Sequence, residues 1–260
     1  MKFKEKYQIK KQYLANNTKR RSGQLISPFV KFIVAHDTGN PGSTAQNNVS
    51  YYEKTNNETE ASAHIFIDDK EIIECIPALT SNKPEKAWHV RYNQSQDNKL
   101  FGSESNDTAI GVEYCYGNNI NADESYKKYV WVIAYLCYKF KLNPAVSITG
   151  HFILDPGRKT DPVSGLKASG RTFEQLLQDI VNEYNLCIES SNTDSTNILP
   201  IKLIKNSSSK KIYAIGQDNK KHWIFNEDTL NIGKNMGLWD NWDEVNDDSY
   251  EEGHVIIMVK

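Results

Sequence analysis

A nine-residue segment without an apolar side chain, ESSNTDSTN from Glu189 to Asn197, divides this chain into two unequal parts. It is rich in serine, threonine and asparagine, which is typical of a linker between domains. Strand-like and helix-like segments alternate before it, and short strand-like segments follow it. We therefore predict a larger domain over residues 1–188, a linker over 189–197 and a small domain over 198–260.

Length and composition allow this division. A chain of 260 residues can form one ordinary domain with a full core and a smaller second one. Its 38% hydrophobic and 25% charged residues are typical of a soluble globular protein. A net charge of -2 argues against a nucleic-acid-binding protein, which is usually basic. The longest apolar run, Val130 to Tyr138, is too short to span a bilayer, so no membrane span is expected.

The larger part carries both strand and helix patterns. Short apolar or alternating runs predict strands over 29–36, 63–68, 71–76 and 109–116, the middle two forming a hairpin. Capping-box spacings begin two helices, one at Asn121 and one at Thr172, and a further helix is expected to begin at Ser43 or Thr44. This order predicts an α/β fold, with a mixed central β-sheet flanked by helices.

After the linker, short apolar pieces are separated by Asn, Asp, Gly and Lys. They lie at 198–204, 211–216, 221–225 and 254–259. Pieces of this length and spacing predict a small all-β module.

The cysteines and the N-terminus bear on where the protein is made. The four cysteines are scattered without a CxxC pair, so we expect reduced core residues in a cytoplasmically made protein. The N-terminus has no apolar core, so no secretory signal peptide is expected. It carries eight Lys or Arg against one Glu in its first 21 residues. These are expected to be a solvated start to the domain, with a weak contact to an anionic surface as the alternative.

Three polar residues follow or close predicted elements. His36 closes the first strand, His151 follows the strand-like piece SITG, and Asp161 lies ten residues later in a loop bounded by Pro and Gly. A catalytic zinc site needs about three protein ligands and one open position. Loops held by a rigid sheet usually carry such ligands. Spacing alone leaves two interpretations open, a zinc site or ordinary hydrogen-bonded histidines beside a solvated loop.

Five segments, in this order, carry a resemblance to a known family: VAHDTGN, ASAHIFIDD, AWHV, AIGVEYCY and TGHFILDPGRKTDP. Together they resemble the zinc-dependent N-acetylmuramoyl-L-alanine amidases of the amidase-2 family, which includes phage lysozyme-type amidases and peptidoglycan recognition proteins. The resemblance extends from about Phe29 to Tyr184. It implies that His36, His151 and Asp161 are the ligands of a Zn²⁺ ion.

The same resemblance implies catalytic residues. Glu113 falls at the position of the acid/base residue, and Lys159 at that of a lysine that stabilises the transition state. Many phage members carry cysteine at the third ligand position, whereas this chain has Asp161, which is also an accepted zinc ligand. Non-catalytic relatives lose a metal ligand, and this chain retains all three.

These residue types suit the hydrolysis of an amide. The reaction needs an activated water, which a bound metal can supply near neutral pH. A carboxylate such as Glu113 can move the proton, and a cation such as Lys159 can stabilise the oxyanion. Strand periodicity places Val112 and Tyr114 on one face and Glu113 on the other, which leaves open whether Glu113 faces solvent or a cleft.

Roles are also expected for residues other than the ligands and the catalytic residues. The resemblance implies substrate contacts for Trp88 and His89. His64 alternates with Ile65 and Ile67, so it could line the cleft and bind substrate, or it could be a structural residue. Three further charged residues are expected to hold their loops rather than bind substrate: Asp155, Arg158 and Arg171.

A catalytic amidase joined by a linker to a small β module resembles a phage endolysin. The resemblance implies bacterial peptidoglycan as substrate, synthesis in the host cytoplasm, and action at the cell wall after release. The C-terminal module would bind cell-wall carbohydrate, with homo-oligomers through it left open. Aromatic residues suited to stacking on sugars, about half of which should instead form the core, are Tyr213, Trp223, Phe225, Trp239 and Trp242.

Two alternatives remain. One is a zinc peptidase that cuts within the stem peptide of peptidoglycan. The other is a non-catalytic peptidoglycan-binding protein, which retention of the ligands together with Glu113 and Lys159 speaks against.

Overall fold

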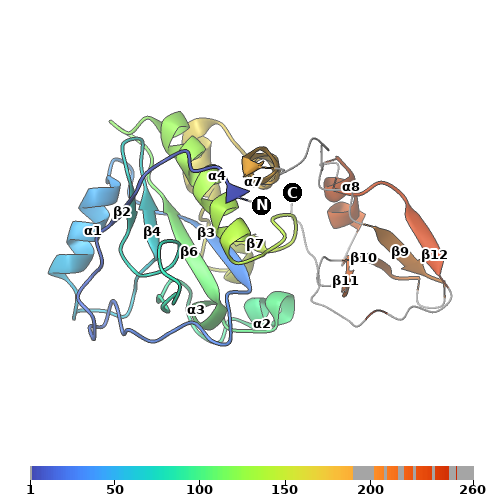
Figure 1. Ribbon diagram of the computed structural model, residues 1–260, viewed down its shortest axis with the longest axis horizontal. Helices are drawn as coiled ribbons and strands as arrows, with labels where there is room; N and C mark the ends of the chain where they lie inside the picture. Colours follow the sequence, from blue (N-terminus) through green and yellow to red (C-terminus); the bar gives the residue numbers. More distant parts are fainter. Residues whose placement is uncertain are drawn as a thin grey trace.

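The structure is a computed structural model that describes residues 2–189, 202–207, 210–215, 220–224, 227–235, 238–245 and 250. The larger part, 2–189, combines strands and helices (Figure 1). Its strands are β1 (Lys2–Phe3), β2 (Ile9–Lys11), β3 (Phe32–Asp37), β4 (Ile65–Ile67), β5 (Ile72–Glu74), β6 (Ala109–Tyr114), β7 (Ile148–Gly150) and β8 (Ile188–Glu189). Its helices are α1 (Ala45–Lys54), α2 (Ser95–Phe101), α3 (Ser105–Thr108), α4 (Ala122–Lys139), α5 (His151–Leu154), α6 (Val163–Leu166), the 3₁₀ helix η1 (Lys167–Ser169) and α7 (Phe173–Cys187).

Six of these strands form one mixed sheet in the order β2-β5-β4-β6-β3-β7. The central strand β3 is parallel to both of its neighbours, β6 and β7. The expected hairpin is present, since β4 and β5 pair antiparallel, although both strands are shorter than the apolar runs suggested. This arrangement confirms the predicted α/β fold with a mixed central sheet.

Side chains along each strand alternate in direction, so a buried strand presents apolar residues to both faces of the sheet. Helices cover both of these faces. In β3, Ile33 and Ala35 belong to a large apolar cluster that includes residues of α4 and α7. Phe32 and Val34 belong to another cluster, which includes Leu100 of α2 and Leu154 of α5. All of β3 is buried, so a side chain at its end is held by packing from both layers.

The predicted helix starts are confirmed. The side chain of Thr44 accepts a hydrogen bond from Asn47 N and caps α1, and Asn121 caps α4 through Glu124 N. Thr172 and Gln175 form the expected capping box at the start of α7. Each cap satisfies a backbone N–H that has no partner inside the helix.

Several elements were not predicted because they are short or lack an apolar pattern. Strand β2 has no fully buried residue and pairs with β5 at the edge of the sheet. Helices α3, α5 and α6 are four residues each, too short for a 3.6-residue period to be recognised.

The C-terminal part contains strands β9 (Leu203–Asn206), β10 (Ile212–Ile215), β11 (Lys221–Trp223) and β12 (Trp242–Val245), and helix α8 (Glu227–Asn235). The strands form a sheet in the order β11-β10-β9-β12, which confirms the expected C-terminal sheet. The all-β expectation missed α8. That helix packs closely on the buried Trp239, since a Cβ at Gly233 would overlap the indole ring. Phe225, most of the 189–197 linker and the 254–259 segment lie outside the described residues.

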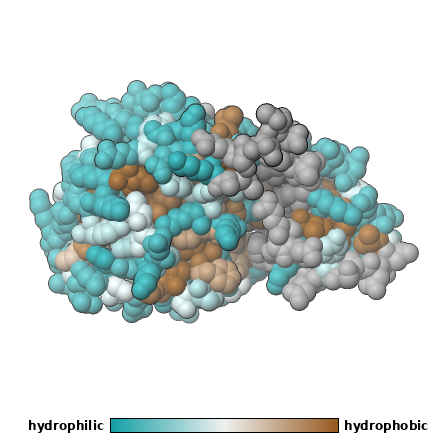
Figure 2. Space-filling model, viewed as in Figure 1, coloured by the Kyte–Doolittle hydropathy of each residue, from teal (hydrophilic) through white to brown (hydrophobic). Residues whose placement is uncertain are grey.

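Two sequence expectations about the whole chain can be compared with the structure. All four cysteines are free and buried, as expected of reduced core residues. Within the described ranges, none of the helices has both the length and the apolar character that crossing a bilayer requires. Figure 2 shows a mainly hydrophilic surface on one face of the molecule, with smaller apolar patches between the polar side chains.

Candidate metal centre

Strand pairing brings the two candidate histidines together. His36 is the fifth residue of β3, and Ala35 beside it pairs in register with Gly150, the last residue of β7. His151 follows immediately, at the start of α5. Parallel strands end at the same edge of a sheet, so both imidazoles lie at the carboxyl ends of β3 and β7.

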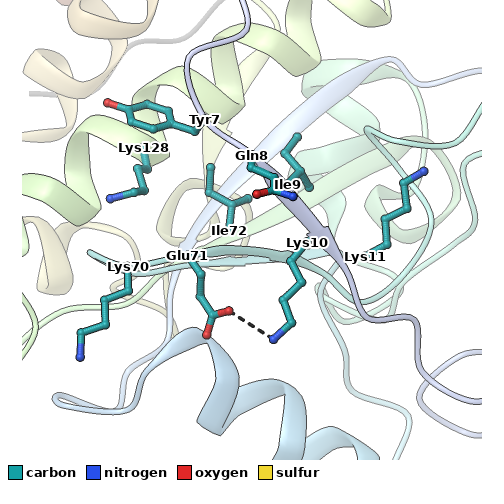
Figure 3. Close-up of a pocket in the computed structure, with 9 residues that line it drawn as sticks. All are labelled: Tyr7, Gln8, Ile9, Lys10, Lys11, Lys70, Glu71, Ile72 and Lys128. Atoms are coloured by element: carbon teal, nitrogen blue, oxygen red, sulfur yellow. Dashed lines mark hydrogen bonds and ion pairs between the residues drawn. The ribbon is translucent and has the colours of Figure 1, made fainter.

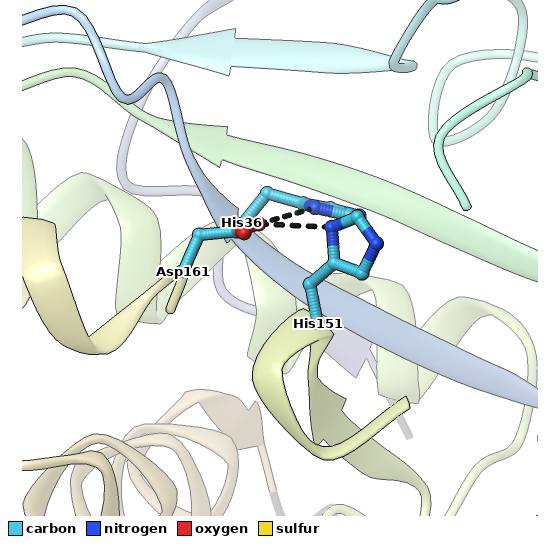
Figure 4. Close-up of side chains that lie close together, drawn as sticks. All are labelled: His36, His151 and Asp161. Atoms are coloured by element: carbon cyan, nitrogen blue, oxygen red, sulfur yellow. Dashed lines mark hydrogen bonds and ion pairs between the residues drawn. The ribbon is translucent and has the colours of Figure 1, made fainter. Parts of the chain in front are cut away.

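Asp161 completes the cluster from the loop that returns after α5 (Figure 4). Its Oδ2 lies 2.9 Å from Nδ1 of His36 and 3.1 Å from Nδ1 of His151. One ligand atom from each of the three side chains lies within 4.8 Å of the others. A backbone hydrogen bond of 3.0 Å from Phe152 N to Asp161 O fixes the loop against the start of α5.

Electrostatics favours the protonation states that a metal ligand needs. Burial lowers the pKa of His36 to about 4, so its imidazole is neutral near pH 7. Burial alone would raise the pKa of Asp161, but hydrogen bonds with His151 and His36 outweigh it and bring that pKa below its ordinary value. Neutral imidazole and ionised carboxylate are the forms that bind metals.

The donor set therefore fits a divalent metal. Two imidazole nitrogens and one carboxylate oxygen converge, and all three side chains are buried. Nitrogen and oxygen donors of these types suit zinc, and three protein ligands leave a further position open.

Glu113 lies beside this cluster. It pairs in register with His36 across β3 and β6, and the two side chains point to the same face of the sheet. Its Oε2 is buried and has no hydrogen-bond partner among the described residues. Burial raises the pKa of Glu113 well above its ordinary value, and the like charges of Asp161 and Asp37 add to this effect. The cleft-facing interpretation of Glu113, rather than the solvent-facing one, matches this placement.

A cation is also close to the cluster. Nζ of Lys159 lies 3.9 Å from Oδ1 of Asp161, and the lysine side chain is 33% exposed. An ammonium group at this position can reach a molecule bound at the centre without leaving its ion pair completely.

The two residues of the AWHV segment differ in placement. Trp88 is partly exposed, and its ring centroid lies 6.2 Å from that of Tyr92. His89 is buried, and its Nδ1 lies 3.0 Å from Nε2 of His36. Nε2 of His89 is also buried, without a hydrogen-bond partner among the described residues. The substrate contacts expected of Trp88 and His89 stay predictions, and Trp88 is the more exposed of the two.

The ring of His64 is held by the backbone. It is fully buried, its Nε2 lies 2.9 Å from the carbonyl oxygen of Glu85, and its Nδ1 accepts a hydrogen bond from Gly111 N at 3.0 Å. Both ring nitrogens are thus used by the backbone, and burial lowers the pKa of His64 to about 4. These contacts support the structural interpretation of His64, while its substrate contact stays a prediction.

The loop roles expected for the other charged residues match the structure. Arg158 forms an ion pair with Asp155, and Arg171 pairs with Asp123 at 2.6 Å. The first pair lies in the loop before Asp161, and the second joins the segment before α7 to the start of α4.

Sequence reasoning missed one residue that supports the centre. Asp37 accepts hydrogen bonds of 2.7 Å each from Ser164 Oγ and Gly165 N, which tie the segment after Asp161 to the end of β3. Its position directly after a candidate ligand was the available signal.

A separate pocket of about 500 Å³ lies at the β2–β5 edge and includes none of the three candidate ligands (Figure 3). Four lysines line it: Lys10, Lys11, Lys70 and Lys128. Lys10 is paired with Glu71 at 3.3 Å. We attach no chemistry to this pocket, although its lysines suit the anionic contact considered as an alternative for the N-terminus.

Comparison with known proteins identifies the family. Residues 27–164 match the family model Amidase_2, described as N-acetylmuramoyl-L-alanine amidase. The N-acetylmuramoyl-L-alanine amidase BlyA of Bacillus subtilis (strain 168) is 32% identical over 149 residues, which are 54% of this chain and 38% of BlyA. The N-acetylmuramoyl-L-alanine amidase CwlA of Bacillus sp is 32% identical over 176 residues, 59% of this chain and 62% of CwlA. The chain thus spans less than two thirds of the length of either relative.

Solved structures agree on the fold. The catalytic domain of XlyA superposes with a TM-score of 0.53 at 22% identity, covering 67% of this chain and 99% of that domain. A mutant endolysin from Bacillus subtilis superposes with a TM-score of 0.52 at 22% identity, covering 66% of this chain and 98% of that structure. The family model covers more than half of the chain and includes all three residues of the cluster, and the chain therefore belongs to the Amidase_2 family of N-acetylmuramoyl-L-alanine amidases.

Proposed function

We propose that this protein is a zinc-dependent N-acetylmuramoyl-L-alanine amidase of the endolysin type. It would cleave the amide bond between N-acetylmuramic acid and L-alanine in the stem peptide of bacterial peptidoglycan. The observation that carries the proposal is the convergence of His36, His151 and Asp161 with Glu113 in register beside His36. Membership of the amidase family supports the choice of substrate bond.

The centre would hold zinc through Nδ1 of His36, Nδ1 of His151 and a carboxylate oxygen of Asp161. When bound, zinc supplies a Lewis acid that makes water nucleophilic near neutral pH. The Phe152–Asp161 backbone bond ties the loop to the start of α5, and Asp37 ties the segment after Asp161 to the end of β3. Both contacts help to keep the ligands in place.

Glu113 would act as the general base and then as the general acid. Its carboxylate can accept the proton of the attacking water and return it to the nitrogen of the departing alanine. A raised pKa suits this second task, since the carboxyl group must hold the proton until the amine leaves. Its unpartnered Oε2 has no competing hydrogen bond in the described structure.

Lys159 would stabilise the transition state. Attack on the amide carbon develops negative charge on the carbonyl oxygen, and an ammonium group nearby offsets that charge. Its distance of 3.9 Å from Asp161 supports this role. Trp88, partly exposed one residue before His89, would contact the muramyl peptide.

The C-terminal module would bind carbohydrate of the cell wall. Tyr213 and Trp239 are buried and belong to its interior, while Trp242 is 37% exposed and Trp223 is partly exposed. Among the aromatic residues that the structure describes, this division leaves Trp223 and Trp242 as those suited to stacking on sugar rings. The enzyme would be made in the host cytoplasm and act on the wall after release.

Two substitutions test the assignment of roles. Glu113→Ala should keep the metal and lose turnover by roughly 100-fold or more, because general acid–base catalysis is removed while the ligands remain. His151→Ala should lose both metal and turnover. Metal content by atomic absorption and hydrolysis of purified walls measure the two effects. Full activity of Glu113→Ala would show that the acid/base assignment is wrong.

The two competing functions give different products. A stem-peptide peptidase would release an amino terminus other than L-alanine, and a non-catalytic binding protein would release no new end group. The retained Glu113 and Lys159 favour an enzyme over a binding protein.

A further inference from the structure

We propose that His89 is a positioning residue that orients His36 for metal binding, rather than a substrate contact. This inference rests on the proposed metal site and concerns the side of His36 that faces away from it. The observation behind it is the 3.0 Å distance between Nε2 of His36 and Nδ1 of His89.

The two rings meet in a geometry that fixes the plane of His36. Their centroids lie 5.2 Å apart and their planes are almost perpendicular, at 89°. Nδ1 of His36 faces Asp161 while its Nε2 faces His89, so both ring nitrogens are engaged from opposite sides. Rotation about either side-chain torsion would break at least one of these contacts.

When His36 is a metal ligand, the position of its ring proton decides which of the two histidines donates the hydrogen bond. A ligand Nδ1 uses its lone pair, so the neutral imidazole must carry its proton on Nε2. Nδ1 of His89 is then the acceptor of that N–H. Metal-bound histidines usually donate their second N–H to an acceptor, and such partners set the tautomer and orientation of the ring. In this chain the acceptor is a second histidine instead of a carboxylate or carbonyl group.

The surroundings of His89 hold its ring in position. The backbone N–H groups of His89 and Val90 both donate to Oδ1 of Asn106 at 3.0 Å. The amide of Asn106 in turn donates to the carbonyl oxygen of Val90 at 2.6 Å. These three hydrogen bonds fix the backbone from which the imidazole of His89 projects.

Gly111 makes room for the ring. It lies on β6, and a Cβ built there would meet Cγ of His89 at 2.7 Å and Nδ1 at 2.8 Å. Both contacts are closer than such atoms can approach, so any larger residue at 111 must displace the imidazole. The absence of a side chain at this position thus matches the close approach of His89 to His36.

The first test measures zinc affinity by competition with a chromophoric chelator, using the full chain. His89→Ala should bind zinc roughly 10- to 100-fold more weakly than wild type, as expected for loss of a ligand's hydrogen-bond partner. His89→Asn, whose amide oxygen can accept the His36 N–H, should recover part of the loss. Gln178→Ala is the control, since this side chain lies on α7 and bonds Asn182, and its zinc affinity should be unchanged.

Substrate kinetics at saturating zinc separate positioning from substrate contact. A positioning role predicts a KM for wall fragments close to wild type in His89→Ala once the metal site is full. Unchanged zinc affinity together with a raised KM would overturn the proposal in favour of a substrate contact. Circular dichroism of the zinc-free variants checks that they are folded.

Gly111→Ala gives a second test that leaves every histidine in place. Displacement of the His89 ring should weaken zinc binding in the same direction as His89→Ala. If both variants bound zinc as tightly as wild type, the positioning role would be refuted and the proposed function would stand. A wild-type chain that bound no zinc would refute the proposed function, and this inference with it.

Discussion

At the scale of single residues, charge and burial divide the polar groups near the end of β3 into three kinds. The carboxylate of Asp161 lies within hydrogen-bond distance of both imidazoles, and it is the anionic member of the cluster. The Oε2 atom of Glu113 is buried beside it without a hydrogen-bond partner in the described structure, and Lys159 supplies a cation 33% exposed to solvent. His64 is fully buried, and both of its ring nitrogens are hydrogen-bonded to backbone groups.

Lys159 gives a prediction about turnover without metal loss. Lys159→Ala should lower kcat by roughly 100-fold, because a charge that stabilises the developing oxyanion is removed. Zinc content should stay at the wild-type level, since the ammonium lies beside a ligand and is not one. Lys159→Arg, which keeps the charge, is the control and should retain more activity than Lys159→Ala. Equal activity of Lys159→Ala and wild type would exclude the role.

His64 gives a prediction about stability and pH. A histidine whose pKa is lowered to about 4 in the folded state binds protons more readily when unfolded. The contribution of neutral His64 to the free energy of unfolding is therefore complete above its unfolded pKa of about 6.5. It is lost as the pH falls towards 4. This gap corresponds to about 3 kcal/mol of unfolding free energy. Urea unfolding of zinc-free protein between pH 7 and pH 4 should show a shallower loss for His64→Gln than for wild type. Parallel curves for the two proteins would contradict the assignment.

At the scale of elements, the site depends on which strands are neighbours. The apolar runs and helix caps predicted the main strands and helices, since period and capping chemistry are local properties. The neighbours of β3 could not be read in the same way, because strand order depends on contacts between distant segments. Resemblance supplied the ligand set, and the register of His36 with Glu113 and of Ala35 with Gly150 explains how the chain assembles it.

The roles of the buried histidines also could not be predicted from the sequence. Alternation along a strand shows which face a side chain takes, but neither His64 nor His89 lies within a strand. Their hydrogen-bond partners, Glu85 and Gly111 for one and His36 for the other, come from remote segments. Such partners decide whether a histidine is structural, and no local pattern reveals them.

The start of α7 gives a prediction at this scale. Thr172→Ala should lower the unfolding free energy by about 1 kcal/mol, because the capping box loses the hydroxyl that accepts from Gln175 N. Gln178→Ala, within the same helix and away from the cap, should cost less. Chemical unfolding measures both values, and an equal effect of the two substitutions would show that the cap does not stabilise the domain.

At the scale of the whole molecule, two folded parts lie on either side of the 189–197 segment. The larger one has its own core and contains every residue assigned to catalysis. The smaller one has its own sheet, and its apolar cluster includes Ala145 and Val181 of the larger part. The linker over 189–197 stays a prediction from its composition, whereas α8 was not predicted, since its segment carries few apolar residues.

Removal of the C-terminal part tests this division. A fragment of residues 1–189 should fold, bind zinc and cleave soluble muramyl peptides, because the centre and the main core lie within it. It should sediment less with purified walls than the full chain does, since the proposed carbohydrate-binding module is absent. Unchanged sedimentation would show that the catalytic domain alone determines wall binding.

The identity of the bond that is broken tests the central claim most directly. Purified Gram-positive walls would be incubated with the zinc-loaded protein, and newly formed amino termini and reducing ends would be labelled and identified. Hydrolysis of the bond between N-acetylmuramic acid and the stem peptide predicts new amino-terminal L-alanine without new reducing ends. Walls treated with the Glu113→Ala variant should show no new amino-terminal alanine. New reducing ends, a different amino-terminal residue, or no new ends from any susceptible wall would contradict the account.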